Sequence, residues 1–185
     1  KRANVSVDRM INIVEDLEVI SRLETDDNEL EFENFNIVQI INEAFDQLEL
    51  KASEMNIKLE LANESSSPIV YGDKNKIQQV FMNLISNSIK YGKKDGKTTV
   101  RLFDMTDKTL IEIADDGIGI DEDSLNRLFE RFYRVDKNRS REIGGTGLGL
   151  AIVKHIIEAH QQTINVRSTV NIGSTFSFIL EKASK

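Results

Sequence analysis

The sequence predicts an α+β fold in which an open, mainly antiparallel sheet carries helices on one face, preceded by one long helix. Two observations lead to this prediction. Helical and strand-like apolar patterns are mixed along the chain without a regular alternation, which favours an antiparallel or mixed sheet over a doubly wound parallel one. The 185 residues, of which 39% are hydrophobic and 30% charged, are enough for one sizeable core or for an ordinary domain with an appendage.

Bulk composition excludes several classes of protein. A net charge of -7 argues against nucleic acid as the main partner, because phosphate backbones are held by clustered cations. The absence of cysteine excludes a disulfide framework and a thiolate zinc site, and it suits a reducing compartment. The chain has no signal-peptide pattern and no apolar run near the ~18 residues of a membrane span. We therefore expect a cytoplasmic piece without membrane contact, and the initial Lys1 suggests a fragment of a longer parent.

The first predicted element is a helix over about residues 5–23. Its apolar residues recur every three or four positions, which gives a wide apolar stripe: Met10, Ile13, Val14, Leu17 and Ile20. A single helix of this kind is marginal in water, so it should pack on another helix from this chain or from a second copy. The run TDDNE at residues 25–29 then interrupts the pattern. We place a boundary there, with residues 1–27 as one unit and residues 28–185 as another.

The larger unit begins with a short strand over residues 30–35, after which Asn36 should cap a helix with an apolar stripe from Ile37 to Leu48. Alternating residues predict a strand at 57–61, and residues 69–71 are long enough only for an edge strand, followed by a turn at Gly72 and an N-cap at Asp73. A helix should follow over residues 74–91. Further strands are predicted at residues 99–103, 110–114, 163–168 and 174–180.

Two later stretches have helical spacing. In SLNRLFERFY the stripe predicts a core-facing helix through Leu125, Leu128, Phe129, Phe132 and Tyr133. Four of the ten glycines stand at residues 144–149 and precede a second stripe, formed by Leu148, Ile152, Val153, Ile156 and Ile157. A glycine loop that leads into a helix N-terminus offers backbone N–H groups to an anion, but a flexible loop before a core helix has the same pattern.

The helix over residues 74–91 carries a polar strip beside its core stripe. Asn83, Asn87 and Lys90 fall within about 60° of one another at helical spacing, to one side of the apolar residues. Such a strip is either a solvated helix edge or a magnesium-phosphate site. Mg²⁺ prefers oxygen ligands and is commonly held by one or two protein groups together with substrate phosphates, while Lys90 would supply a point charge to a phosphate.

Two further segments combine polar chemistry with glycine or with positive charge. In ADDGIGID a predicted strand ends at Asp115, which is followed by Gly117 and Gly119; this is either a turn or a base-binding carboxylate, which would accept from the adenine amino group and repel the guanine oxygen. Residues 131–141 carry five basic side chains and a single carboxylate, that of Asp136. That basic segment is either a solvated loop or a polyphosphate contact.

Five stretches in one order carry a resemblance to a known family. They are NLISNSIKYG at residues 83–92, DDGIGI at 115–120, LFERFYRVD at 128–136, GGTGLGLAIVKHI at 144–156 and GSTFSF at 173–178. From about Leu30 onwards the chain resembles the ATP-binding catalytic domain of two-component sensor histidine kinases, with their N, G1, F and G2 boxes and a last box. The opening helix is similar to the second helix of that family's dimerisation and phosphotransfer hairpin. The resemblance implies the two-layer α/β sandwich of the histidine kinase/gyrase-type ATPases, with a mixed, mainly antiparallel sheet.

The resemblance implies roles for individual residues. Asn87 would hold the magnesium, with Asn83 as support, and Lys90 and Arg134 would meet phosphates, which makes Asn87, Lys90 and Arg134 the predicted catalytic set. Asp115 would bind the adenine amino group, and residues 135–146 would form a lid over ATP. The predicted nucleotide-binding residues are Asn83, Asn87, Lys90, Tyr91, Asp115, Gly117, Gly119, Ile120, Tyr133, Arg134, Gly145, Thr146, Gly147, Leu148, Gly149, Leu150 and Thr175.

The resemblance also implies a reaction and its partners: Mg-ATP as cofactor, a response-regulator receiver domain as partner, and a homodimer for the full-length parent. The family phosphorylates a histidine on the first hairpin helix, and no such segment stands here; His155 and His160 lie on the helix after the glycines, where a packed or solvated role is expected. We therefore expect an acceptor upstream and no self-labelling. The alternatives are a related ATP-hydrolysing module or a nucleotide-sensing one. The hydrolases carry a glutamate where Asn83 stands, and an amide cannot take a proton from water.

Overall fold

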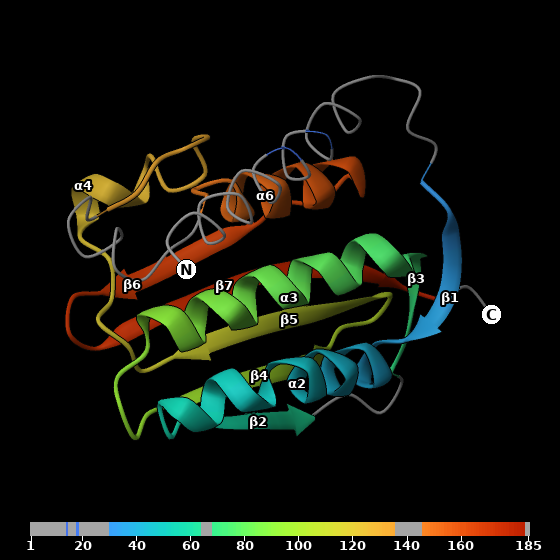
Figure 1. The fold of residues 1–185 in the computed structure, drawn as a ribbon. Helices are drawn as coiled ribbons and strands as arrows, with labels where there is room; N and C mark the ends of the chain where they lie inside the picture. The colour runs from blue at the N-terminus through green and yellow to red at the C-terminus, as the bar shows by residue number, and fades with distance from the viewer. Residues whose placement is uncertain (1–13, 15–17, 19–29, 64–67, 136–145, 184–185) are drawn as a thin grey trace.

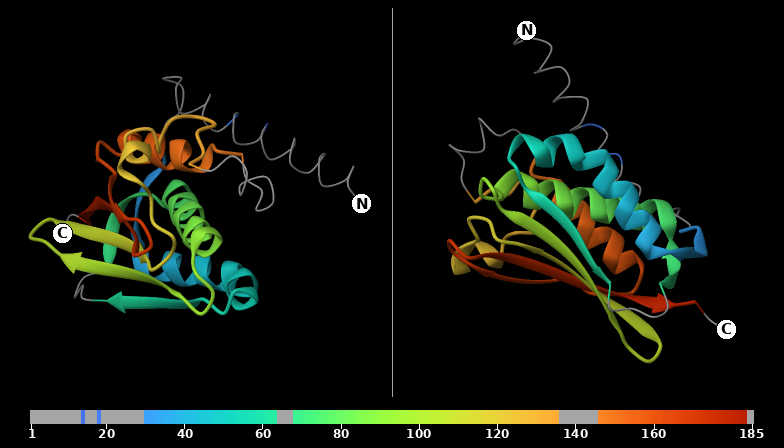
Figure 2. Two further views of the ribbon diagram at one scale, coloured as in Figure 1. Left: turned by 90° about the vertical axis from the view of Figure 1, so that its left-hand side faces the viewer. Right: turned by 90° about the horizontal axis from the view of Figure 1, so that it is seen from below.

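The computed structural model describes residues 14, 18, 30–63, 68–135 and 146–183. The predicted helix over residues 5–23 falls, apart from Val14 and Glu18, outside these residues, as does the predicted boundary at 25–29. The remainder forms a sheet with the helices α2 (Ile37–Glu54), α3 (Lys74–Tyr91) and α6 (Gly149–Ala159) on one face (Figure 1). In the two other views no described helix covers the opposite face of the sheet (Figure 2). The predicted fold class is confirmed.

The strands match the alternating segments of the sequence, with ends shifted by at most two residues. They are β1 (Phe32–Asn36), β2 (Lys58–Asn63), β3 (Ile69–Asp73), β4 (Lys97–Asp104), β5 (Lys108–Asp115), β6 (Asn165–Thr169) and β7 (Gly173–Lys182). A short helix, α4 (Glu122–Leu125), lies between β5 and α6. The predicted helix caps are confirmed: the Asn36 side chain accepts from the N–H groups of Val38 and Gln39, and that of Asp73 accepts from Lys76 N–H.

The sheet is mainly antiparallel. Its strand order is β1-β3-β7-β5-β4-β2, with β6 paired to β7, and among these described strands only the β2–β4 pair is parallel. The prediction that residues 69–71 form an edge strand is wrong, because β3 lies between β1 and β7. The prediction rested on the short length of the segment, whereas β3 extends through Asp73, and the carbonyl of Pro68 just before it accepts from Ile37 N–H.

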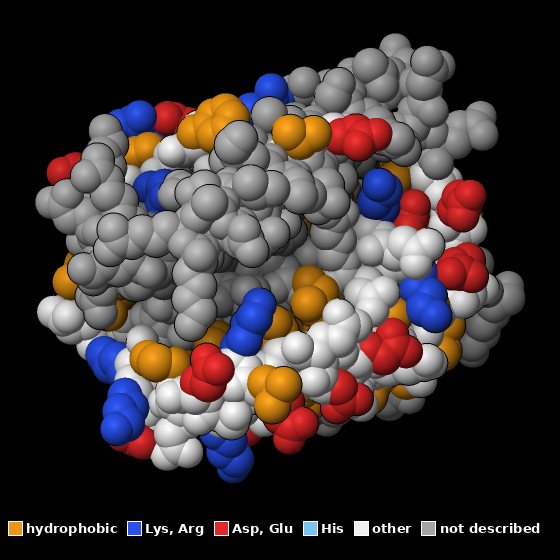
Figure 3. All heavy atoms as spheres, in the orientation of Figure 1, with side chains coloured by type: hydrophobic (Ala, Val, Ile, Leu, Met, Phe, Trp, Pro, Cys, Tyr) orange, Lys and Arg blue, Asp and Glu red, His pale blue; other side chains and the backbone are white. Residues whose placement is uncertain are grey.

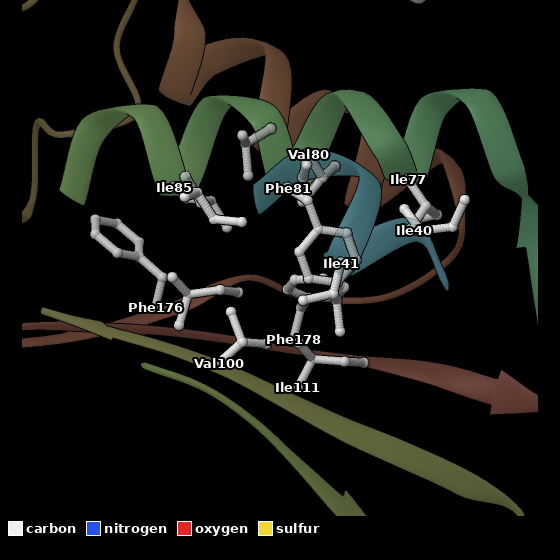
Figure 4. Packing of buried hydrophobic residues seen from close by; sticks show 14 of the residues in the cluster. Ile40, Ile41, Ile77, Val80, Phe81, Ile85, Val100, Ile111, Phe176 and Phe178 are labelled. Carbon is white, nitrogen blue, oxygen red and sulfur yellow. The ribbon is translucent and has the colours of Figure 1, made fainter. Parts of the chain in front are cut away.

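The core lies between the sheet and the three long helices. Phe81 of α3 contacts Phe178 of β7 with ring centroids 5.9 Å apart, and Ile41 of α2 points into the same layer (Figure 4). Every residue of the apolar stripe predicted for α3 is buried: Ile77, Val80, Phe81, Leu84, Ile85 and Ile89. The stripe predicted for α6 is buried as well: Leu148, Ile152, Val153, Ile156 and Ile157. These two stripes fix α3 and α6 beside one another on the sheet.

The helix predicted through residues 125–133 is wrong. Only Glu122–Leu125 is helical, and turns follow. Phe132 has a φ of 62° and its side chain is 55% exposed, so it cannot continue a right-handed helix or join a core stripe. Its N–H donates instead to the carbonyl of Gly147, 3.0 Å away. A tertiary hydrogen bond to the glycine segment therefore replaces the local helix.

The described surface carries charges of both signs. Acidic and basic side chains are interspersed among apolar ones over the lower part of the helical face in Figure 3. Within the described part of the chain, no helix combines the length and the apolar character that crossing a lipid bilayer requires.

Candidate nucleotide-binding site

A cavity of about 270 Å³ opens between α3, the C-terminal end of β5 and the N-terminal end of α6. Its lining is polar on the α3 and β5 sides and apolar where Leu128, Leu150 and Phe176 contribute. The residues around it are Asn83, Ser86, Asn87, Ser88, Lys90, Tyr91, Asp115, Ile118, Gly119, Ile120, Leu128, Tyr133, Arg134, Val135, Thr146, Gly147, Gly149, Leu150, Ser174 and Phe176. Segments far apart in sequence thus meet around one concave space, which is typical of a small-molecule site.

Helix α3 supplies one wall of the cavity. The predicted strip of Asn83, Asn87 and Lys90 lines it, while the buried stripe on the same helix holds α3 on the sheet. The ammonium of Lys90 lies 5.1 Å from the ring centroid of Tyr91, a cation–π distance. Burial raises the pKa of the Tyr91 phenol, and the positive charge of Arg134 opposes that rise. The basic residues at this wall favour an anionic ligand.

Asp115 is the last residue of β5 and lines the cavity. Its Oδ1 accepts from the N–H groups of Gly117, at 2.9 Å, and Ser174, at 3.3 Å. Burial raises the pKa of its carboxyl, and these two N–H donors partly oppose the rise. Neither bond uses Oδ2. A half-buried carboxylate whose orientation is fixed by two backbone donors is suited to accept one further hydrogen bond from a ligand.

The loop after Asp115 is packed closely against its neighbours. Gly119 has a φ of 68°, and a Cβ placed there would lie 2.0 Å from the carbonyl oxygen of Thr169. A Cβ at Gly117 would lie 2.5 Å from the carbonyl oxygen of Tyr91. Only glycine fits at these two positions. The loop is thereby held between the end of α3 and the β6–β7 turn. Gly117 does not line the cavity, and it contributes to the site through its N–H, which donates to Asp115 Oδ1.

The segment before the undescribed residues 136–145 forms another wall. Tyr133 and Arg134 line the cavity, and the Tyr133 hydroxyl donates to Ser124 Oγ at 3.0 Å. The Arg127 guanidinium lies 4.5 Å from the Tyr133 ring centroid on its face. The Tyr133 hydroxyl is therefore bonded to α4, and Arg127 contacts one face of its ring. The predicted residue Gly145 and most of the predicted lid, residues 135–146, lie outside the described part of the chain.

The glycine segment approaches the polar strip of α3. A Cβ at Gly149, the first residue of α6, would lie 2.9 Å from Asn83 Oδ1. Gly147 has a φ of 78° and faces the backbone of Phe132. The N-cap residue of α6, Leu148, makes no capping bond through its own side chain, and its N–H donates to Thr146 Oγ1 at 3.2 Å. The positive end of this helix therefore lies at the cavity beside Asn83.

The structure brings most of the predicted site residues together. The predicted residues that line the cavity are Asn83, Asn87, Lys90, Tyr91, Asp115, Gly119, Ile120, Tyr133, Arg134, Thr146, Gly147, Gly149 and Leu150. Leu148 is fully buried in the core instead, and Thr175 points to the other face of β7 from its lining neighbour Ser174. The sequence reasoning missed Ser86, Ser88, Ile118, Leu128, Val135, Ser174 and Phe176. Strand alternation could have found Ser174 and Phe176, since both share a face with the buried Phe178.

The model of the histidine kinase-, DNA gyrase B-, and HSP90-like ATPases matches residues 72–184. Drug sensory protein A of Synechocystis sp. is 37% identical over an alignment of 188 positions, which covers 96% of this chain and 28% of that protein. The sensor histidine kinase WalK of Bacillus subtilis is 36% identical over 175 residues, which cover 94% of this chain and 28% of that protein. The chain thus spans little more than a quarter of the length of these relatives.

Solved structures give the same result. The nucleotide-free catalytic domain of histidine kinase ThkA is similar with a TM-score of 0.72 and 30% identity, over 82% of this chain and 96% of that one. ThkA in complex with the response regulator protein TrrA is similar with a TM-score of 0.78 and 26% identity, over 97% of this chain and 49% of that one. The match over residues 72–184 and these likenesses agree with the fold and the cavity. The chain belongs to the histidine kinase-, DNA gyrase B-, and HSP90-like ATPase family, and within it to the ATP-binding domains of sensor histidine kinases.

Proposed function

We propose that the cavity binds Mg-ATP and positions its γ-phosphoryl group for transfer to a histidine on a segment preceding the described domain, within a two-component sensor kinase. The observation that carries the proposal is the meeting of Asn87 and Asp115 in one cavity. These two residues offer different chemistry to a nucleotide: an amide oxygen for a metal and a carboxylate for a base. They lie on α3 and at the end of β5, so one ligand that spans both must be elongated.

The proposal assigns the adenine to the Asp115 end. The carboxylate would accept from the exocyclic amino group of adenine, whereas the guanine oxygen at the same position would be repelled. The apolar lining from Ile120, Leu150 and Phe176 would contact the flat ring. Gly117 and Ser174 hold the carboxylate in position for this contact through their N–H groups.

The proposal assigns the phosphates to the opposite end, where Lys90 and Arg134 line the cavity. The N-terminus of α6 adds the positive end of a helix dipole there. Phosphoryl transfer requires mostly positioning and charge neutralisation, which these cationic groups can supply.

The donor set fits magnesium. Asn87, with Asn83 one turn away, supplies amide oxygens at the cavity wall. Among the described residues no group of three or more His, Asp or Glu could hold a metal alone, so phosphate oxygens would complete the coordination, as is usual for Mg²⁺. When bound, the metal would neutralise phosphate charge.

Transfer is favoured over hydrolysis by the chemistry of Asn83. An amide at this position cannot accept a proton from an attacking water at neutral pH. The partner of such a kinase would be a response-regulator receiver domain, and the parent would act as a homodimer; the similarity to ThkA, whose structure contains a response regulator, supports the first of these.

The proposal is tested by titrating the chain with ATP and with GTP, each with and without Mg²⁺, in a calorimeter. We expect magnesium-dependent binding of ATP and at least about tenfold weaker binding of GTP, since a buried hydrogen bond to a charged group contributes about 1.5–3 kcal/mol. Absence of ATP binding, or equal affinity for the two nucleotides, contradicts the proposal.

A further inference from the structure

His160, the C-cap residue of α6, is buried with 6% of its surface exposed, and both of its ring nitrogens take part in hydrogen bonds. Nδ1 lies 2.8 Å from the Ile156 carbonyl oxygen, and Nε2 lies 2.9 Å from the Asp73 backbone N–H group. A carbonyl can only accept and a backbone N–H can only donate. The ring must therefore be neutral, with its proton on Nδ1.

Asp73 extends this contact to two further segments. Its Oδ1 accepts from Lys76 N–H at 3.0 Å and so caps α3, and its Oδ2 accepts from Glu31 N–H at 3.2 Å. The His160–Asp73 pair thus joins the C-terminus of α6, the N-terminus of α3 and the segment just before β1. The contact is tightly packed, because a Cβ at Gly72 would lie 3.2 Å from the His160 ring.

The same two helices build the nucleotide site at their other ends. The C-terminal half of α3 carries Asn87 and Lys90, and the first residue of α6, Gly149, lies against Asn83. The orientation of α6 along α3 is therefore fixed at one end by the His160–Asp73 contact and at the other by the Gly149–Asn83 contact. Without the His160–Asp73 hydrogen bond, the described contacts between α3 and α6 are mainly those of the apolar core, and apolar packing is not directional.

We propose that His160 is a positioning residue that aligns α6 with α3 only in its neutral form, so that protonation of its ring weakens nucleotide binding. Protonation adds an N–H at Nε2, which then faces the N–H of Asp73, donor against donor. The inference rests on the proposed nucleotide binding. It adds a pH-dependent control at a position outside the cavity lining.

The surroundings of the ring set the direction of the effect. β3 and the start of α3 bring the carboxylate of Asp73, β1 brings the uncharged ring of Phe32 at 5.1 Å, and Tyr71 stacks on Phe32. Burial lowers the pKa of His160, while the Ile156 carbonyl and Asp73 oppose this. A histidine with a lowered folded pKa stabilises the fold above its unfolded pKa of about 6.5, and this contribution is lost as the pH falls towards the folded pKa.

The first test uses the histidine ring ¹⁵N signals of the whole chain, for which His155 is an internal reference. We expect an unprotonated Nε2 and a protonated Nδ1 on His160 at pH 7.5, with a titration midpoint below that of free histidine. An Nε2–H tautomer, or a midpoint at or above about 6.5, overturns the inference without involving any nucleotide.

The second test measures ATP affinity from pH 7.5 to 5.0 for the wild type, His160→Gln, His160→Ala and the matched control His155→Gln. Glutamine keeps an acceptor for the Asp73 N–H but does not titrate. We expect the ratio of wild-type to His160→Gln affinity to fall at least about fivefold towards pH 5.0, the lower end of coupling between separate sites. His160→Ala should bind more weakly than His160→Gln at every pH, and His155→Gln should keep the wild-type profile.

Parallel pH profiles for wild type and His160→Gln refute the positioning role. If instead the wild type binds no ATP at pH 7.5, the proposed function is wrong, and the two failures are thereby distinguished. Should His160→Ala not fold, the glutamine variant and the ring titration still decide the question.

Discussion

At the scale of single residues, Asp115 illustrates how the site conflicts with stability. Burial raises the pKa of the Asp115 carboxyl, because the folded protein disfavours its ionised form. Keeping this carboxyl ionised at neutral pH therefore lowers the free energy of unfolding. The cost is fully present above the raised folded pKa and disappears below the ordinary pKa of aspartate. Two backbone donors reduce this cost but do not remove it. A carboxylate kept at such a position is consistent with a ligand-binding role.

Replacing Asp115 by asparagine should therefore separate stability from binding. Asn keeps an oxygen for the Gly117 and Ser174 donors and removes the buried charge, so chemical denaturation at pH 7 should show equal or higher stability. ATP affinity should fall at least about tenfold, because the charged acceptor for the adenine amino group is lost. The preference for ATP over GTP should narrow. A variant that binds ATP as tightly as the wild type contradicts the base-binding role.

Asn87→Ala tests the proposed metal contact. The variant removes the amide oxygen from the cavity wall, and we expect Mg-ATP affinity to fall about tenfold while affinity for ATP without Mg²⁺ changes little. Asn42→Ala, on the exposed face of α2, is the matched control and should leave both affinities unchanged. Equal losses with and without Mg²⁺ would assign Asn87 to the nucleotide itself rather than to the metal.

At the scale of elements, local patterns predicted the structure well where one face packs on the core. The α3 stripe from Ile77 to Ile89 determined both the helix and the side on which Asn87 lies, because burial and helical spacing agree there. The segment around Phe132 had the same spacing but different contacts. Its path depends on the hydrogen bond from Phe132 N–H to Gly147, which no local pattern contains.

The site itself shows the same limit. Motif resemblance predicted Thr175 as a nucleotide-binding residue, whereas Ser174, which pairs with Asp115 across the sheet, is the residue that lines the cavity. Phase is fixed by the register between distant strands, so a shift of one residue moves every side chain to the other face. The cavity lining from Ile118 and Val135 depends likewise on how separate loops meet, which the sequence does not encode locally.

The loop between β5 and α4 yields a prediction at this scale. Gly119→Ala places a Cβ where the Thr169 carbonyl lies 2.0 Å away and imposes a φ of 68° on alanine, so the loop must shift. We expect stability to fall by about 2 kcal/mol and ATP affinity to fall at least about tenfold, as measured by denaturation and calorimetry.

Asn36→Ala is the control for stability alone. It removes the cap of α2, away from the cavity, and should lower stability by about 1 kcal/mol while leaving ATP affinity unchanged. If Asn36→Ala weakens ATP binding as much as Gly119→Ala does, the effect of Gly119 follows from general destabilisation rather than from the shape of the loop.

At the scale of the whole molecule, the sandwich separates the chemistry of the site from its support. The sheet and the helices α2, α3 and α6 form one continuous buried core, while the cavity lies at the ends of α3, β5 and α6. The helix axes can thus be held by packing while loops at their ends contact a ligand. This arrangement places the candidate nucleotide site at those ends, and none of the described residues that line the cavity is a histidine.

The presence of a candidate nucleotide site without a histidine in its described lining determines the expected outcome of a phosphorylation experiment. Both rings lie outside the cavity lining, and the two nitrogens of His160 are engaged with Ile156 and Asp73, so neither His155 nor His160 should be a nucleophile. The 185-residue chain, incubated with γ-labelled Mg-ATP, should therefore acquire no acid-labile label. A longer chain of the parent that includes the proposed acceptor segment should become labelled, and the label should disappear in acid and with Asn87→Ala. Mass spectrometry that finds phosphate on His155 or His160 would contradict the proposed division between donor domain and acceptor segment.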